Sequence, residues 1–346
     1  MATTRLTLTR EQVLAHRRRV THLDERLPPG PDSLRRAAVA GLSDSMPRAA
    51  VLSLHARVRG VAPGSWEDPA LVQLWGPRFS VYAVAAPDRA VFTVGRSTAG
   101  SDRLALGEEL ADRLEAALQG ERVPMAEAAR AIGVGHPNAL RYAAPTGRLL
   151  VRWDGARQPH VWIVPRPDTD PDEARLELVR RYLHALGPGT PAGFGDWAGA
   201  RPAPARTRFE ALRDELVPVT TPVGEAWVLA ADEASFREPA GPPAPVRLLP
   251  SGDTFFLLQG EDRTLLVPDA DQRAGLWPSR VWPGALLLDG DVAGTWRRSQ
   301  HVVRVHPWVA LTAVQRAAVA AEAASLPLPG LDRDLVVHWE GASGAP

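Results

Sequence analysis

The polar residues best suited to chemistry lie in one short stretch, residues 41–60. The stretch begins with a cluster of small polar side chains: Ser43, Asp44 and Ser45. A helix is predicted from Pro47 to about Val58. The polar face of this helix carries Arg48, His55 and Arg59. A polar cluster, a helix start and arginines within one turn favour contact with a phosphate backbone. The alternative is a capped helix with solvated arginines.

All forty basic residues of the 346-residue chain are arginine. Every positive side chain is therefore a planar, permanently charged fork that suits phosphates and base edges. Without lysine, a Schiff base on a lysine side chain and a phosphate-loop lysine are excluded. The net charge is zero, but it is unevenly distributed. Residues 1–60 hold eleven arginines against five acidic residues, a net of +6, and residues 231–295 hold five against ten, a net of −5. The basic N-terminal region favours a nucleic-acid partner.

Several classes of site lack their sequence signatures. The chain has no cysteine, no Gly-x-Ser-x-Gly elbow and no glycine-rich nucleotide loop, and its nine histidines do not cluster at metal-ligand spacing. No apolar run reaches the length of a membrane span, and residues 1–5 lack the apolar core of a signal peptide. We therefore predict a cytoplasmic monomer without metal, cofactor or membrane association.

Helices followed by strands recur three times along the chain, which is the element order of a winged helix. The first cycle begins at the capping box Thr9–Gln12 and ends in a strand over 79–84. The second contains a periodic helix over 104–118 and a hairpin over 149–164. The three cycles define predicted winged-helix units at residues 1–100, 101–166 and 167–236.

The proline-rich segment 238–245 is a predicted linker to a C-terminal domain, residues 246–346. This domain is expected to be β-rich and to carry a terminal helix over 312–325. Its strands are predicted at 255–258, 264–267, 285–288, 292–296, 302–305 and 335–337. The predicted fold class is α+β, with three tandem winged-helix units and a C-terminal β-rich domain.

A winged helix places its third helix in a groove of the nucleic acid and its hairpin on the backbone. The predicted contacts from third helices are Arg48, Arg57, Arg59, Arg141, Arg206, Arg208 and Arg213. A late hairpin adds a patch that could stack on or clamp a strand: Trp296, Arg297, Arg298 and His301. The alternatives are solvated surface arginines and a tryptophan that covers the β core.

Motifs along nearly the whole chain carry a resemblance to a known family. They are Gly41-Leu42 with its polar triplet and Pro47, and the segments 56–58, 74–78, 181–188, 194–197, 282–290 and 294–297. With these motifs the chain resembles the bacterial winged-helix DNA-binding family that includes DNA glycosylases of the AlkZ type. Those enzymes excise bulky alkylated bases and unhook interstrand crosslinks. The resemblance implies three winged helices around a concave surface that binds double-stranded DNA, closed by a β domain. Among the predicted DNA contacts it places Arg78, just before the first wing.

In the glycosylase branch of that family, a Gln-x-Gln motif, or a variant with Asp as its second member, follows the Gly-Leu pair and holds the water that attacks the sugar. In this sequence the two positions are Ser43 and Ser45, with Asp44 between them. The resemblance therefore implies these three as the catalytic residues, with the carboxylate of Asp44 taking over the role of the glutamines. A shifted register would instead offer His55 and Arg57 as the polar pair.

Three interpretations of function stay open at this point. The first is a monofunctional DNA glycosylase that acts on alkylated or crosslinked bases. The second is a non-catalytic DNA binder, either a regulator or a lesion-sequestering protein, that has lost the Gln-x-Gln motif. The third is a concave face that binds a small toxic metabolite or a protein. Turnover separates the first two, and failure to bind DNA even at low salt points to the third.

Overall fold

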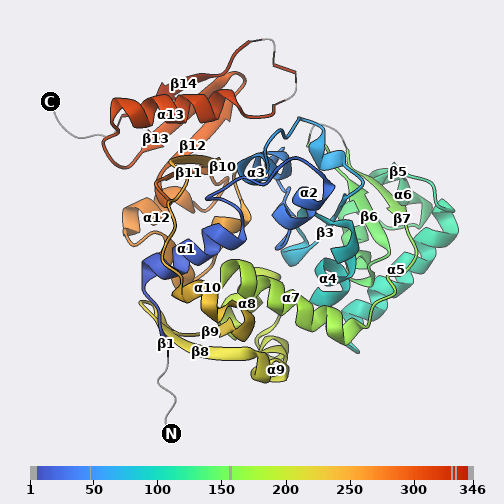
Figure 1. Cartoon of the computed structure of the whole chain (residues 1–346). Coiled ribbons are helices and arrows are strands. Elements are labelled where there is room, and N and C mark those ends of the chain that lie inside the picture. Colours follow the sequence, from blue (N-terminus) through green and yellow to red (C-terminus); the bar gives the residue numbers. More distant parts are fainter. Residues whose placement is uncertain (1–5, 47, 156–157, 329, 332, 342–346) are drawn as a thin grey trace, which may run out of the picture.

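The computed structural model describes residues 6–46, 48–155, 158–328, 330–331 and 333–341. Three small sheets and their helices form most of the molecule, and a five-stranded sheet covered by helix α13 (Ala313–Ala324) stands at one end (Figure 1). The protein is therefore a mixed α+β protein, as predicted.

The first sheet has the order β2-β4-β3, with antiparallel pairing throughout. Its elements are α1 (Arg10–Val20), α2 (Pro31–Ala37), β2 (Leu42–Ser43), α3 (Ala49–Arg57), β3 (Leu71–Trp75), β4 (Val81–Ala85) and α4 (Arg89–Thr93). The capping box is confirmed, because Thr9 and Gln12 exchange both side-chain-to-backbone hydrogen bonds. The predicted helix start at Pro47 lies outside the described residues. Strand β3 was not predicted, although it lines the site described below.

The second sheet has the order β5-β7-β6 and a hydrophobic core largely of its own. Its elements are α5 (Asp102–Leu118), β5 (Val123–Pro124), α6 (Met125–Ala131), a 3-10 helix (Pro137–Thr146), β6 (Leu149–Arg152) and β7 (His160–Ile163). The predicted helix over 104–118 and the hairpin over 149–164 are both confirmed. Helix α5 begins where the Ser101 hydroxyl accepts a hydrogen bond from the amide of Leu104, a normal N-cap.

The third sheet takes one strand from the start of the chain. Its elements are α7 (Pro171–Leu186), α8 (Pro191–Ala198), α9 (Pro202–Ala211), β8 (Leu216–Thr221), β9 (Gly224–Leu229) and α10 (Glu233–Arg237). Strand β1 (Leu6–Thr7) pairs in parallel with β8, with Leu6 opposite Val219. The predicted unit 1–100 therefore does not close on itself. That each of the three units is a winged helix stays a prediction.

The C-terminal sheet has the order β10-β11-β12-β13-β14. Its strands are β10 (Val246–Leu249), β11 (Gly284–Leu288), β12 (Asp291–Ser299), β13 (Val302–Pro307) and β14 (Val336–Trp339). The apolar faces of α3, of this sheet and of α13 share one core, so the first unit and the C-terminal domain are packed together. The strands predicted at 255–258 and 264–267 are wrong.

Those two segments fold as a 3-10 turn (Thr254–Phe256) and as helix α11 (Glu261–Leu266), followed by α12 (Ala270–Leu276). The carboxylate of Asp253 accepts the amide of Phe255 and so starts the turn. Phe255 and Phe256 are fully buried in the largest hydrophobic core, which also contains residues of the first and third units. Their burial, rather than β-pairing, explains the apolar run.

Candidate catalytic crevice and nucleic-acid interface

The three residues of the polar cluster do not face one cavity. Ser43 lies opposite Tyr82 in the β2–β4 pair and is buried, with 6% of its surface exposed. A Cβ built on Gly252 would lie 3.5 Å from its hydroxyl oxygen, so the C-terminal domain covers this side chain. Asp44 is also buried, whereas Ser45 is exposed. Of the three, only Asp44 lines the crevice between the first and second units.

The Asp44 carboxyl group accepts hydrogen bonds from α3 and from β3, and its partner on β3 also bonds to the second unit. Its Oδ1 accepts a hydrogen bond of 3.0 Å from the amide of Ala50, in the first turn of α3. Its Oδ2 accepts a hydrogen bond from Nε2 of Gln73, on β3. The same Gln73 amide also clasps the backbone of Trp153: its Nε2 donates to the carbonyl at 3.1 Å, and its Oε1 accepts the amide at 2.8 Å. Gln73 thus connects the carboxyl to the hairpin of the second unit, and sequence reasoning missed it.

Burial raises the pKa of Asp44 to about 7. The hydrogen bonds from Ala50 and Gln73 and the positive charges of Arg48 and Arg152 favour the carboxylate and limit this rise. A carboxyl group that changes charge near neutral pH is suited to general acid–base catalysis. The same environment also fits a structural role, because each oxygen already accepts a hydrogen bond.

Asp44 lies on a narrow crevice between the first and second units. The other lining residues are Arg48, Val51, Trp66, Trp153, Asp154 and Gly155. The crevice leaves no room for a water molecule, so solvent can reach the carboxyl only if the second unit's hairpin moves away from the first unit. Arg48 stands at its edge in a left-handed conformation, with φ of 68°, at the position preceding α3.

Ser43 is buried and Ser45 is exposed, so we expect the two positions to differ in how well they accept the glutamine of the family motif. We expect Ser43→Gln to destabilise the protein by about 1–3 kcal/mol, because the longer side chain must displace the segment around Gly252. We expect Ser45→Gln to change the free energy of unfolding by less than about 0.5 kcal/mol, because Ser45 is exposed. Denaturant unfolding measures both changes. Equal stability of the two variants would show that position 43 can accept a glutamine.

The raised pKa of Asp44 predicts a pH dependence of stability. Between 3.8, the ordinary value, and about 7, the folded protein holds a proton that the unfolded chain has lost. This group therefore lowers the free energy of unfolding as the pH rises through that range. We expect Asp44→Asn to gain stability relative to the parent protein on going from pH 5 to pH 8. Denaturant unfolding at both pH values measures this, with the exposed Asp32→Asn as control. Parallel profiles for Asp44→Asn and the parent would contradict it.

Four of the residues predicted to contact DNA are buried with internal partners, which corrects these predictions. Arg57 forms a doubly hydrogen-bonded ion pair with Asp253, with both N–O distances at 2.7 Å. The Arg208 guanidinium donates to the carbonyl of Ser97 at 2.6 Å. The other two are His55, whose Nε2 lies 3.1 Å from the Ser325 hydroxyl, and Trp296, whose indole donates to the carbonyl of Leu249 at 2.8 Å.

Burial also lowers the pKa of His55 to about 4, so this imidazole is neutral near pH 7. The alternative register, with His55 and Arg57 as the polar pair of the active site, is therefore wrong. Both side chains face the C-terminal domain instead of the crevice, as their bonds to Ser325 and Asp253 show.

The remaining predicted contacts reach the surface. They are Arg59, Arg206, Arg213, Arg297 and Arg298, which are exposed, and Arg48, Arg78, Arg141 and His301, which are half-buried. Two of them lie near each other. Arg298, on β12, is exposed over much of its side chain, but partial burial lowers its pKa and the positive charge of Arg48, just before α3, lowers it further. Arg141 lies instead near Arg96 and Phe79, at the junction of the three units, and Arg78 lies beside Tyr82 of β4.

The described part of the chain offers no cluster of three or more histidine, aspartate or glutamate side chains that could ligate a metal. Within the same residues, no helix combines the length and the apolar character needed to cross a membrane.

The solved structure of the DNA glycosylase AlkZ of Streptomyces sahachiroi has the same fold, with a TM-score of 0.80 over 97% of this chain and 100% of that chain, at 19% sequence identity. The interstrand DNA cross-link repair glycosylase of Streptomyces sahachiroi is 31% identical over 162 residues, which are 45% of this chain and 42% of that protein. The alignment thus spans less than half of that relative.

The model of the AlkZ-like DNA glycosylase family matches residues 35–327, which include α3, the crevice and most of the C-terminal sheet. The chain belongs to the AlkZ-like DNA glycosylase family.

Proposed function

We propose that this protein is a DNA glycosylase that hydrolyses the N-glycosidic bond of alkylated or crosslinked bases in double-stranded DNA. One observation carries the proposal: a buried carboxyl group with a pKa of about 7 lies in the crevice, within the segment that matches the glycosylase family. Asp44 is the residue between the two positions where the resemblance places the water-holding glutamines.

The proposed reaction is monofunctional hydrolysis. Water forms a bond to C1′ of the sugar while the bond from C1′ to the base nitrogen breaks, through a transition state with positive charge on the sugar. The Asp44 carboxylate stabilises this charge and accepts a proton from the water, and the proton is then passed to the departing base. Arg48 and Arg298 hold phosphates on either side of the sugar.

The crevice must open for this chemistry, since it has no space for water in the present structure. The clasp between Gln73 and Trp153 is the contact that closes it. Extrusion of a base from the duplex costs a few kcal/mol, and this cost is lower for a damaged base whose stacking is already weakened. Entry of the extruded nucleotide beside Trp153 would separate the two units and expose the carboxyl.

A second candidate function, DNA binding without catalysis, is supported by the two serines that stand where the family motif has glutamines. Ser43 is covered by the C-terminal domain and Ser45 is exposed, so the two hydroxyls cannot hold one water molecule between them. Both oxygens of Asp44 already accept hydrogen bonds. A chain with this arrangement would bind damaged duplex DNA without cleaving it, and Asp44 would serve to fix the start of α3.

The two functions are distinguished by turnover. The protein is incubated with a duplex that carries an alkylated purine and, separately, with a duplex that carries an interstrand crosslink. The expected product is an abasic site, detected as a strand break after alkaline treatment, with an undamaged duplex as control. Tight, salt-dependent binding without any abasic product would leave the non-catalytic DNA binder as the function. Failure to bind either duplex at low salt would exclude both.

A further inference from the structure

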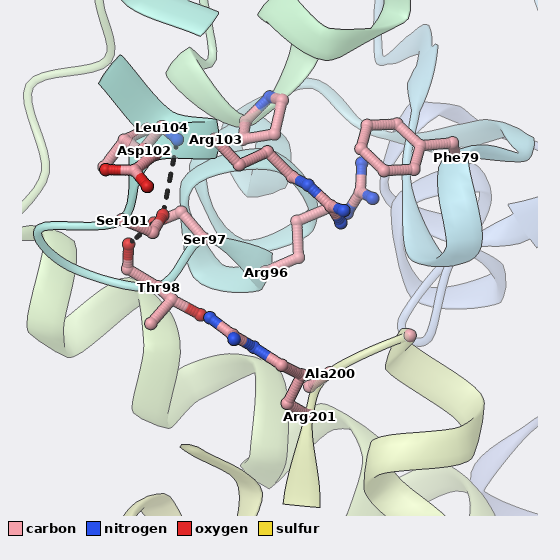
Figure 2. A pocket seen from close by; sticks show the side chains of 12 residues that line it. Phe79, Arg96, Ser97, Thr98, Ser101, Asp102, Arg103, Leu104, Ala200 and Arg201 are labelled. Atoms are coloured by element: carbon pink, nitrogen blue, oxygen red, sulfur yellow. Dashed lines mark hydrogen bonds between the residues drawn. The ribbon is translucent and has the colours of Figure 1, made fainter. Parts of the chain in front are cut away.

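A second cavity, away from Asp44, lies where the three units meet. It has a volume of about 330 Å³, which is within the range of small-molecule sites. Its walls come from the segment 96–98, the start of α5 and the connection between α8 and α9. Figure 2 shows three arginines directed into it: Arg96 and Arg103 lie together beside Phe79, and Arg201 extends across from the opposite wall.

Arg96 is held in place by the wall of the cavity. Its guanidinium carbon lies 3.9 Å from the centre of the Phe79 ring, and Nη1 donates to the carbonyl of Trp75 at 3.3 Å. Burial, together with the nearby charges of Arg103 and Arg141, lowers the pKa of Arg96 to about 10. Arg141 also approaches Phe79, at 5.7 Å, and its buried Nε has no hydrogen-bond partner within the described structure. The guanidinium groups of Arg96, Arg103 and Arg141 therefore lie near one another, and Arg201 reaches into the same cavity from the opposite wall, toward Thr98.

This cluster lacks the acidic partners that several other arginines of the described chain have. Arg57, Arg148 and Arg181 are each paired with aspartate or glutamate. Across the described ranges, the four clustered arginines, Arg96, Arg103, Arg141 and Arg201, form no ion pair. The acidic residue at the cavity, Asp102, points away from the arginines (Figure 2). Like charges at close range repel, so an anion from outside the chain would stabilise the cluster.

We propose that this cavity binds a phosphate group. A phosphate matches the planar forks of arginine, which bind it through paired, charge-assisted hydrogen bonds. Arg96, Arg103 and Arg201 supply these forks, and the hydroxyl of Thr98, which lines the same wall, adds a neutral donor. The volume accommodates an adjoining sugar as well. The phosphate comes either from the backbone of DNA or from a free mononucleotide, and the chemistry of the site is the same for both. The site does not depend on glycosylase activity.

The test uses the double variant Arg103→Gln/Arg201→Gln in the full chain. Both side chains are exposed, so their loss leaves the packing of the fold intact. The control is Arg130→Gln, which removes one exposed arginine from α6, outside the cavity. Three affinities are measured for each protein: for duplex DNA over a range of salt concentrations, for deoxyadenosine 5′-monophosphate, and for inorganic phosphate. The proteins are compared by circular dichroism to confirm that they are folded.

If the phosphate belongs to the DNA backbone, the double variant binds duplex at least about tenfold more weakly, and the slope of log affinity against log salt falls by about 1 for each phosphate that the variant no longer binds. If it belongs to a free nucleotide, affinity for the monophosphate is abolished while duplex affinity matches the control. Unchanged affinity for all three probes would overturn the proposal. Base excision is measured separately, so a failure of the glycosylase assay leaves these results interpretable.

Discussion

Replacing Asp44 with asparagine is expected to lower the rate of base excision by about 100-fold or more while duplex binding is retained. Asparagine keeps the shape of the side chain and can still accept the amide of Ala50. It cannot take up the proton of the attacking water or carry the negative charge that stabilises the sugar cation. Because burial raises the pKa of Asp44 to about 7 in the free protein, excision at sub-saturating duplex should rise with pH through neutrality as the carboxyl ionises. Single-turnover excision on both sides of pH 7 measures both effects.

Asp32→Asn is the matched control, since this carboxylate is exposed on α2 and pairs with Arg35 at the surface. It should leave excision and its pH dependence unchanged. If Asp44→Asn excises bases at the parent rate, the carboxyl is structural and the proposed role in catalysis is wrong. If Asp44→Asn loses both duplex binding and excision, the variant no longer forms the interface between the first and second units.

Replacing Arg57 with alanine is expected to lower the free energy of unfolding by about 3–5 kcal/mol. The substitution leaves the Asp253 carboxylate, which has no exposed surface, without its cation. Only the Ser53 hydroxyl and the Phe255 amide remain as donors to it. The ion pair also joins α3 to the C-terminal domain, so its removal weakens the contact between them. Denaturant unfolding measures the change, and the fraction that stays folded should bind duplex with unchanged affinity.

Two further variants test whether the effect comes from an unpaired buried charge. Arg35→Ala breaks an exposed ion pair and should cost about 1 kcal/mol or less. The double replacement Arg57→Met/Asp253→Leu removes both charges and should recover part of the stability that Arg57→Ala forfeits. If Arg57→Ala is as stable as the parent protein but binds DNA more weakly, Arg57 contacts DNA and its proposed structural role is wrong.

Elements with local signals were predicted well. The capping box at Thr9, the periodic helix α5 and the hairpin of β11 and β12 all depend on residues close together in sequence, and the structure confirms them. The segment 255–258 was predicted wrongly, because a run of four apolar residues fits a buried turn as well as a strand. Its conformation depends on Asp253 and on packing against the first and third units, which the pattern does not contain.

The same limit applies to the candidate site. The position of Asp44 could be predicted from the resemblance, but its partner Gln73 lies 29 residues away on an unpredicted strand. Arg57 and Arg208 have the spacing of DNA-contacting arginines on third helices, yet their partners Asp253 and Ser97 are 196 and 111 residues away. Charge on a helix therefore identified candidate cations, while burial by distant segments decided which of them remain accessible. The arginine cluster was missed because its members come from separate segments.

The pairing of β1 with β8 sets an order for events during synthesis. Leu6 and Thr7 pair with Val219 and Thr220, which are made more than two hundred residues later. The packing of helix α1 is also delayed, because its partners α7 and α10 are made later. During synthesis Leu6 and Thr7 therefore have no partner strand while the second unit, whose core is largely its own, is made. The last of the small sheets to be translated is the one that secures the beginning of the chain.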